Sequence, residues 1–455
     1  MKRQKHVAVV GAGLAGLLAA RELRRHGVSV TVYEAGKQVA GLARSFTDQE
    51  VFTYDFGAHF ITNRLAAALG IGAQCRDVHH YGESVLLDGR AYSYPFGLIR
   101  SPRFLLSALG ARVSARSPSP PASAAEWYRR EYGRVLAERV AIPLVEAWSG
   151  APADALAASV IPPQVDRGTA HVMKLRWASK LSGRAVANGY SREKPESAHV
   201  WHVYPSGSLG LLCEKLSEGC EGRIRLESPV EAILVEGEAV VGVRVNGRDE
   251  EADAVVSTAP VHVLPKLVRG SDGVKHLARF RYRPMALVNM KFKGRGILPD
   301  VVNWIPDPEV PFFRLTEATR SMPWLAPEGK TILTVDIGCE VGDEHWRMAD
   351  DVLGDHCLGH LVRLFPSLRG RYLGCAVLRT PIAHPVFLRE YEPERLALEQ
   401  QLPIRGLFSI GRNGEFAHIL MEDVYWRTLG KMGRVLGFLE SSKSEARVFE
   451  PEATV

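Results

Sequence analysis

Three glycines near the N-terminus have the spacing of a loop that binds a phosphate group. Gly11, Gly13 and Gly16 follow the short apolar run Val7 to Val10, and a stretch of helical composition follows them. The first glycine allows a tight turn, the second lets the backbone approach a pyrophosphate, and the third lets helix and strand pack closely. Backbone N–H groups and the positive end of the helix dipole would then face the phosphate charge.

An acidic residue completes this motif. Glu34 ends a second predicted strand, Val28 to Tyr33, and it lies about 20 residues after the glycines, where a carboxylate can accept hydrogen bonds from the ribose hydroxyls of a dinucleotide. The simpler alternative is a glycine-rich turn followed by a surface carboxylate. Strand, glycines, helix and acidic residue occur in the order that a dinucleotide-binding βαβ unit requires, so the sequence predicts such a unit.

The residues beyond Glu34 distinguish one dinucleotide from another. Gly41 and Arg44 match the extended fingerprint of the glutathione-reductase-like FAD-binding families, although Ala40 stands where that pattern has its first glycine. Near the C-terminus, Gly411-Arg412 followed by a predicted helix resembles the second flavin-contacting segment of the same families. The resemblance implies one FAD and no separate NAD(P)H domain. No cysteine lies in the C-terminal flavin segment, so we expect FAD to be held non-covalently.

Over almost its whole length the chain resembles the flavin amine oxidase superfamily, which includes protoporphyrinogen oxidases, phytoene-desaturase-like enzymes and UDP-galactopyranose mutases. The resemblance rests on the segments 55–61, 204–210, 228–233, 254–260, 313–387 and 411–423. It implies that the segment through Gly57 passes beside the flavin and that the backbone of Val230 holds the adenine. It also implies that Gly411, Arg412 and Met421 contact the cofactor.

The last of these segments is most similar to the end motif of the mutases. In mutases, tyrosines in this motif bind the diphosphate of a nucleotide sugar. Phe416 and His418 stand in the corresponding places here, and Phe416 lacks the hydroxyl group. The fold implied by the resemblance is therefore better defined than the substrate.

The candidate catalytic residues each have a simpler alternative. The resemblance places His59 beside the flavin, and an imidazole titrates near neutral pH, but a packed histidine with one backbone hydrogen bond is an equal alternative. Glu422 lies at the start of the last predicted helix. Its negative charge could be catalytic, or it could only stabilise the positive end of the helix dipole. Arg314 could hold an acidic substrate group or be a solvated strand charge. Lys291 or Lys293 could be the lysine that amine oxidases keep near flavin N5, and strand alternation leaves open which one points inward.

The favoured reaction is FAD-dependent two-electron dehydrogenation of a small organic substrate at a C–N, C–O or C–C bond, by hydride transfer to flavin N5. Oxygen or another acceptor would reoxidise the flavin. The first alternative is a redox-neutral sugar mutase that resembles UDP-galactopyranose mutase. The second is a non-catalytic FAD-binding protein.

The elements that must position these residues predict an α/β fold. It consists of a Rossmann-like, glutathione-reductase-like FAD-binding domain with an interleaved α+β substrate domain. We expect the FAD-binding domain to comprise residues 1–95, 205–270 and 385–440, the substrate domain to comprise 96–204 and 271–384, and a frayed tail to follow from 441 to 455. Helices are expected over 125–158 and 421–439, and hairpins among the apolar segments between 223 and 258.

Composition excludes several other classes of protein. The chain has 455 residues, 46% of them hydrophobic and 24% charged, and a net charge of +6 from scattered basic residues. This balance is typical of a soluble globular protein and disfavours a nucleic-acid partner. The six cysteines form no CxxC pair, so neither a metal site nor a disulfide framework is expected. We expect a cytoplasmic protein without an integral membrane segment, and an oligomer is possible.

Overall fold

The computed structural model describes residues 4–57, 60–94, 97–98, 101–114, 120–160, 169–399 and 402–448. Its first layer is a parallel sheet with the strand order β10-β2-β1-β14-β21. These strands span Ile224–Arg225, Ser29–Tyr33, His6–Val10, Ala254–Ser257 and Leu407–Ser409, respectively. Three distant parts of the chain therefore meet in one sheet.

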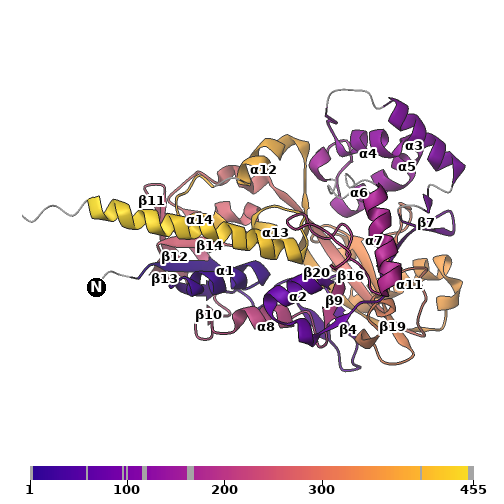
Figure 1. Cartoon of the computed structure of the whole chain (residues 1–455), viewed down its shortest axis with the longest axis horizontal. Coiled ribbons are helices and arrows are strands. Elements are labelled where there is room, and N and C mark those ends of the chain that lie inside the picture. The colour runs from indigo at the N-terminus through magenta and orange to yellow at the C-terminus, as the bar shows by residue number, and fades with distance from the viewer. Residues whose placement is uncertain are drawn as a thin grey trace, which may run out of the picture.

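Both faces of this sheet are covered. Because side chains alternate along a strand, Val7 and Val9 of β1 pack with the helical core, and Ala8 and Val10 pack with the opposite core. The yellow helix α14 runs beside the indigo helix α1 on the helical face (Figure 1). The helices near this face are α1 Leu14–Arg25, α2 Asn63–Leu69, α8 Leu211–Ser217, α13 Gly411–Gly414 and α14 Met421–Val448.

A small sheet covers the opposite face, with the order β13-β12-β11-β15. Its strands are β11 Val230–Glu236, β12 Ala239–Val245, β13 Arg248–Glu251 and β15 Val268–Arg269. Asn246 and Gly247 join β12 to β13 with φ angles of 50° and 71°, as a tight hairpin turn requires. The hairpins predicted at the two turns are confirmed, but the predicted strands near 224 and 254–257 pair in the parallel sheet and not in hairpins.

The second layer is a seven-stranded sheet with the order β20-β16-β19-β18-β17-β7-β8. Its strands are β7 Glu83–Leu87, β8 Arg90–Ser93, β16 Arg281–Lys293, β17 Val302–Trp304, β18 Arg314–Thr316, β19 Lys330–Gly338 and β20 Tyr372–Val386. Residues 83–93 therefore pair with strands of the expected substrate domain, so the chain crosses over earlier than the expected boundary at residue 95. Otherwise the division into two discontinuous domains remains our proposal.

The helical stretch predicted over 125–158 forms as several short helices. Gly133 interrupts it with a φ of 77°, and a Cβ there would lie 2.3 Å from the carbonyl oxygen of Ser107. Gly150, with a φ of 67°, ends it. The helices of this lobe, at the upper right of Figure 1, are α3 Pro102–Ser114, α4 Ala124–Tyr132, α5 Arg134–Leu136, a π-helical turn Ala137–Ala141, α6 Ile142–Ser149 and α7 Thr169–Ser182.

The last helix is longer than expected. It continues to Val448, because neither glycine nor proline occurs between 441 and 448 to stop it; residues 449–455 lie outside the described part. The remaining elements are β3 Ser45–Thr47, β4 Thr53–Asp55, β5 Ile61–Thr62, β6 Cys75–Asp77, β9 His202–Pro205, α9 Leu264–Leu267, α10 Glu344–Arg347, α11 Asp350–Leu364 and α12 Glu392–Leu398. Within the described ranges, no helix combines the length and the apolarity that a bilayer crossing demands.

Candidate active site

The three N-terminal glycines have different surroundings. Gly11 has a φ of 97°, and a Cβ there would lie 2.2 Å from Oγ1 of Thr258. A Cβ on Gly16 would lie 2.0 Å from the carbonyl oxygen of Gly11. A Cβ on Gly13 would meet no atom within 4 Å among the described residues. Gly11 and Gly16 are thus needed for packing inside the loop, and Gly13 leaves space for a group outside it.

Glu34 lies beside this loop. One carboxylate oxygen, Oε2, accepts a hydrogen bond from the backbone N–H of Ala12 at 2.8 Å, and Oε1 accepts one from Gly36 at 2.7 Å. The N–H of Ser228 donates to the carbonyl oxygen of Glu34 at 2.8 Å. This contact brings the start of β11, where Val230 lies, to the end of β2.

The segment after Glu34 returns to the loop. The N–H of Ala40 donates to the carbonyl oxygen of Ala12 at 2.9 Å, and a Cβ on Gly41 would lie 3.7 Å from Cα of Gly13. Ala40 has a φ of 93°, a conformation that favours glycine. Its backbone therefore follows the course of the glycine pattern although its side chain departs from it.

Arg44 supplies a donor at the same place. Its Nε is buried and has no hydrogen-bond partner among the described residues, and its guanidinium lies 4.7 Å from the ring centre of Phe46. A buried donor of this kind is costly unless a ligand pairs with it. Open space at Gly13, the Arg44 guanidinium and the Glu34 carboxylate together fit the pyrophosphate and ribose of a dinucleotide.

The C-terminal flavin segment packs directly on the first turn of α1. Gly411 has a φ of 78°, and a Cβ there would lie 2.7 Å from Cβ of Ala15. The guanidinium of Arg412 points to the end of β20, where Nη2 lies 3.0 Å from the carbonyl oxygen of Ala383 and 2.9 Å from Nδ1 of His384. Nε of Arg412 is buried without a partner in the described chain. Arg412 thus joins the parallel sheet to the seven-stranded sheet.

Two histidines and a tryptophan lie close together around Arg412. The rings of His384, His418 and Trp148 lie 5.2–5.3 Å apart, centre to centre. Arg412, His384 and His418 are each only partly exposed. We call these three residues, together with Arg314, the cationic wall.

Burial and mutual repulsion set the charge of this wall. Burial, with a contribution from Arg412, lowers the pKa of His418 to about 3 and that of His384 well below its usual range. Burial and the nearby Arg314 also lower the pKa of Arg412, to about 10. At neutral pH the wall therefore holds two charged guanidinium groups and two neutral imidazoles, an arrangement that favours a bound anion.

Arg314 reaches this wall from β18. Its cross-strand neighbour on β19 is Asp336, which is fully buried and forms an ion pair with it. Nη2 of Arg314 lies 3.4 Å from the position that a Cβ on Gly57 would occupy. The structure thus places Arg314 against Gly57, in the segment expected beside the flavin, and not on a solvated strand.

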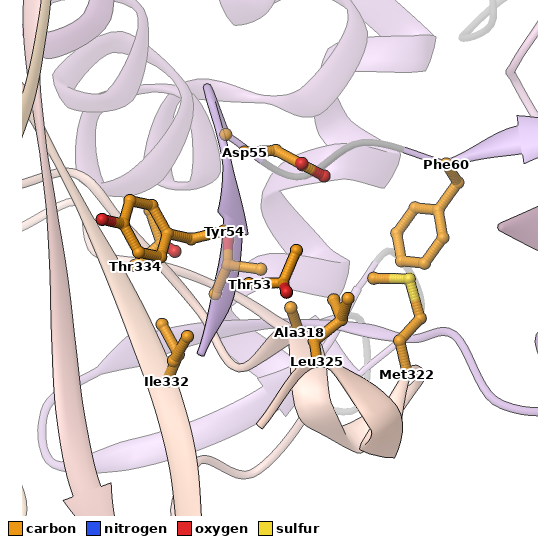
Figure 2. A pocket seen from close by; sticks show the side chains of 11 residues that line it. Thr53, Tyr54, Asp55, Phe60, Ala318, Met322, Leu325, Ile332 and Thr334 are labelled. Carbon is orange, nitrogen blue, oxygen red and sulfur yellow. The ribbon is translucent and has the colours of Figure 1, made fainter. Parts of the chain in front are cut away.

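A small cavity of about 20 Å³ adjoins Gly57 (Figure 2), large enough for a water molecule. Asp55 points from β4 toward Phe60 in this view. The hydroxyl of Tyr204 donates to both carboxylate oxygens of Asp55, at 3.0 and 3.2 Å. Burial nevertheless raises the pKa of Asp55 to about 7. Further residues that line the cavity are Thr53, Tyr54, Thr316, Ala318, Met322, Leu325, Ile332 and Thr334.

Aromatic rings enclose the adjacent space. Phe60, Tyr81 and His202 lie 5.2–5.5 Å apart, and Tyr190 lies 4.9 Å from His202. Burial raises the pKa of Tyr81 well above its usual value and lowers that of His202 to about 4. This group of rings is therefore uncharged at neutral pH.

Other predicted site residues lie elsewhere. His59 lies outside the described residues. Glu422 is fully buried at the start of α14, where its oxygens accept hydrogen bonds from Nε of Arg64 at 2.5 Å and Oγ1 of Thr62 at 2.9 Å. These contacts favour an anchoring role over catalysis. Met421 is the first residue of the same helix.

The lysines proposed for the N5 position are not at the cationic wall. Lys291 forms ion pairs with Asp48 and Glu50, and Lys293 is exposed. Asp55, His384 and Trp148 were not predicted as site residues. Asp55 and His384 stand in segments on which the resemblance rests, and this is the only sequence signal for them.

Comparisons with known proteins give one family and one fold. The profile of the flavin containing amine oxidoreductase family matches residues 14–384. The solved structure of reduced UDP-galactopyranose mutase matches with a TM-score of 0.76 at 19% identity, over 96% of this chain and 94% of that one. Cyclohexylamine oxidase from Brevibacterium oxydans matches with a TM-score of 0.70 at 16% identity, over 96% and 100%.

Curated relatives match less of the chain. Mitochondrial protoporphyrinogen oxidase of Nicotiana tabacum is 25% identical over 346 residues, which are 64% of this chain and 66% of that protein. A putative flavin-containing monooxygenase of Arabidopsis thaliana is 69% identical over only 39 residues, and the match spans 23% of its length. For a second such monooxygenase of the same plant, the match spans 9% of its length.

Proposed function

The chain belongs to the flavin containing amine oxidoreductase family, and from this we propose that it oxidises a small organic molecule at a C–N, C–O or C–C bond. Membership makes the chain an FAD-dependent oxidoreductase. The type of substrate bond that reacts, and net oxidation as opposed to isomerisation, are what we propose.

The residues of this chain would hold the cofactor at two places. The loop through Gly13 and the donor of Arg44 would bind the pyrophosphate, and Glu34 would bind the ribose. Arg412, at the start of α13, would direct positive charge toward the flavin. No covalent bond is needed for this arrangement.

The cationic wall is the observation that supports oxidation most strongly. Bound FAD would supply the electron-accepting chemistry, and the guanidinium groups of Arg412 and Arg314 would stabilise negative charge that develops beside them. Arg412 and Arg314 are fixed by contacts on β20 and with Asp336, so they need not reorganise when charge develops.

Proton transfer would fall to a different group. His418 and His384 have pKa values too low to hold a proton at neutral pH, so they can only orient a ligand by hydrogen bonds. Asp55, with a pKa of about 7, can hold or release one. We infer that Asp55 is the proton acceptor of the site and that Tyr204 orients its carboxylate.

A sugar mutase is the second candidate, favoured by the structural similarity to reduced UDP-galactopyranose mutase. One contact argues against it. Phe416 is fully buried, with its ring 4.7 Å from that of Phe280 and 5.1 Å from that of Tyr282. It faces a hydrophobic core, so nothing at this position replaces a diphosphate-binding tyrosine.

Anaerobic mixing distinguishes the two candidates. The purified protein is mixed with amines, alcohols and nucleotide sugars while the flavin absorbance is followed, then exposed to air. Oxidation predicts bleaching by one substrate class and recovery in air. Isomerisation of a nucleotide sugar only after prior reduction with dithionite, without bleaching by any amine or alcohol, would establish the mutase instead.

A further inference from the structure

Two helices, α3 and α7, each expose several large apolar side chains; both helices lie in the right half of Figure 1. Helix α7 exposes Met173, Trp177 and Leu181, and helix α3 exposes Leu105, Leu106 and Leu109. Elsewhere in the described ranges, exposed large apolar residues occur singly along the sequence. A group of this kind on a protein surface usually marks an interaction site.

The three residues of α7 form one stripe. They are spaced four residues apart, so they lie on one side of the helix. Their exposed fractions are 44%, 60% and 84% for Met173, Trp177 and Leu181, respectively, whereas Leu175 on the other side is 2% exposed. Leu175 holds α7 against the protein, and the stripe faces outward.

The charged side chains on α7 and α3 are all basic, although Glu196 of a neighbouring segment lies 3.9 Å from His171 in the first turn of α7. Helix α7 contains Lys174, Arg176 and Lys180 and no acidic residue, and α3 contains no acidic residue either. Nζ of Lys180 lies 5.9 Å from the ring centre of Trp177. An apolar stripe with tryptophan and leucine, bordered by lysines, is the pattern of helices that lie in the interface of a lipid bilayer.

We propose that α7 binds the surface of a membrane that contains anionic lipids. Trp177, Leu181 and Met173 enter the boundary between headgroups and acyl chains, and Lys174 and Lys180 contact lipid phosphates. The negative surface potential of such a membrane attracts juxtaposed basic residues. This peripheral contact is separate from the oxidation reaction, because none of these residues lies at the cationic wall or the cavity.

Charge disfavours the main alternative occupant, a second copy of the chain. A symmetric dimer through α7 would place Lys174 and Lys180 of one subunit near the same lysines of the other. No acidic residue on α7 is present to compensate them. Like charges in an interface oppose association, whereas an anionic bilayer complements them.

Sedimentation with lipid vesicles tests the proposal. The purified holoprotein is centrifuged with vesicles of phosphatidylcholine alone and of phosphatidylcholine mixed with phosphatidylglycerol. We expect binding to the mixed vesicles, weak binding to the neutral ones, and loss of binding in high salt because the charges are screened. The tryptophan fluorescence should shift to shorter wavelength when Trp177 leaves water.

Matched variants localise the effect. The double variant Trp177→Ser, Leu181→Ser should bind the mixed vesicles about tenfold more weakly or worse, which corresponds to about 1.4 kcal/mol. Val341→Ser is the control, since Val341 is 60% exposed outside this lobe. Flavin content and melting temperature should be unchanged in both variants, because all three side chains are exposed.

Three outcomes would overturn the proposal. The first is absence of the protein from the vesicle pellet, and the second is equal binding by the wild type and the α7 double variant. The third is a concentration-dependent dimer that the double variant abolishes, which would make α7 an interface between copies of the chain.

Discussion

Nη2 of Arg412 lies 2.9 Å from Nδ1 of His384. Arginine has donors but no acceptor, so Nδ1 must carry the lone pair, and the proton of the neutral imidazole must be on Nε2. The bond links the helix that follows the parallel sheet to the seven-stranded sheet, and it can exist only while His384 is neutral.

Acid should therefore weaken the protein through its buried histidines. The pKa of His418 is about 3 and that of His384 is well below its usual range, whereas both titrate near 6.5 when unfolded. The unfolded state then binds more protons, so stability is lost as the pH falls below about 6.5 toward 3. We expect the melting temperature of His418→Asn to fall less between pH 7 and pH 5 than that of the wild type. An equal fall in melting temperature for the variant and the wild type would contradict this. The variant His276→Asn, at an exposed histidine, serves as the control.

Asp55 should have the opposite pH dependence. Its pKa is about 7 in the fold and near 3.9 when unfolded, so the folded state binds the proton more tightly. Stability contributed by the protonated form is present at low pH and is lost as the pH rises from about 4 to 7.

The variant Asp55→Asn tests this assignment. It keeps an acceptor for Tyr204 and cannot ionise, so we expect it to be more stable than the wild type by roughly 4 kcal/mol above pH 7 and no more stable near pH 4. Denaturant unfolding at several pH values measures the difference. If Asp55 also accepts a proton from substrate, the kcat of the variant should no longer change with pH near pH 7. A difference in stability that does not change with pH would refute the raised pKa.

Glu422 should affect stability and not chemistry. Glu422→Gln removes the charge that pairs with Arg64, and we expect a loss of about 2–3 kcal/mol, less than for a fully buried pair because Arg64 is partly exposed. The rate of flavin reduction in the folded variant should stay within about twofold of the wild type. Thr62→Val removes another hydrogen bond to Glu422 and also the cap that Thr62 Oγ1 provides to the N–H of Leu65, so it should cost about 1–2 kcal/mol. A large loss in the rate of flavin reduction at unchanged stability would contradict this and would indicate a catalytic role for Glu422.

The loop glycines should separate FAD binding from folding. A Cβ on Gly13 meets no described atom, so the Gly13→Ala apoprotein should melt within the error of the wild type while its affinity for FAD falls at least tenfold, about 1.4 kcal/mol. A Cβ on Gly16 meets the carbonyl oxygen of Gly11 at 2.0 Å, so Gly16→Ala should lower the melting temperature of the apoprotein. The expectation fails if the two variants behave alike.

The sequence was most informative where the determinants are local. The first strand, helix and second strand follow from apolar spacing and three glycines, each of which acts on its immediate neighbours. Ala40 shows the limit of such patterns. It departs from the expected glycine, yet its backbone has a φ of 93°, because the bond to Ala12 and the turn at Gly41 impose the conformation.

Contacts between distant segments could not be predicted. The cationic wall joins residues from a helix, a strand and a loop, and nothing in the sequence brings Trp148 to His418. Lys291 and Lys293 were candidates because amine oxidases keep a lysine near flavin N5, and strand alternation could not show which one points inward. In the structure Lys291 pairs with the carboxylates of Asp48 and Glu50. The helical stretch predicted over 125–158 is confirmed for most of its length, but the break at Gly133, where φ is 77° against the backbone of Ser107, was not predicted.

The midpoint potential of the bound flavin tests the central claim most directly. The purified protein is titrated anaerobically with a reducing dye system while its visible spectrum is recorded, and Arg412→Met is treated in the same way. We predict flavin absorbance, a potential above that of free FAD because of Arg314 and Arg412, and a lower potential in the variant. A colourless protein that cannot be reconstituted with FAD, or a potential that the variant does not change, would contradict the account.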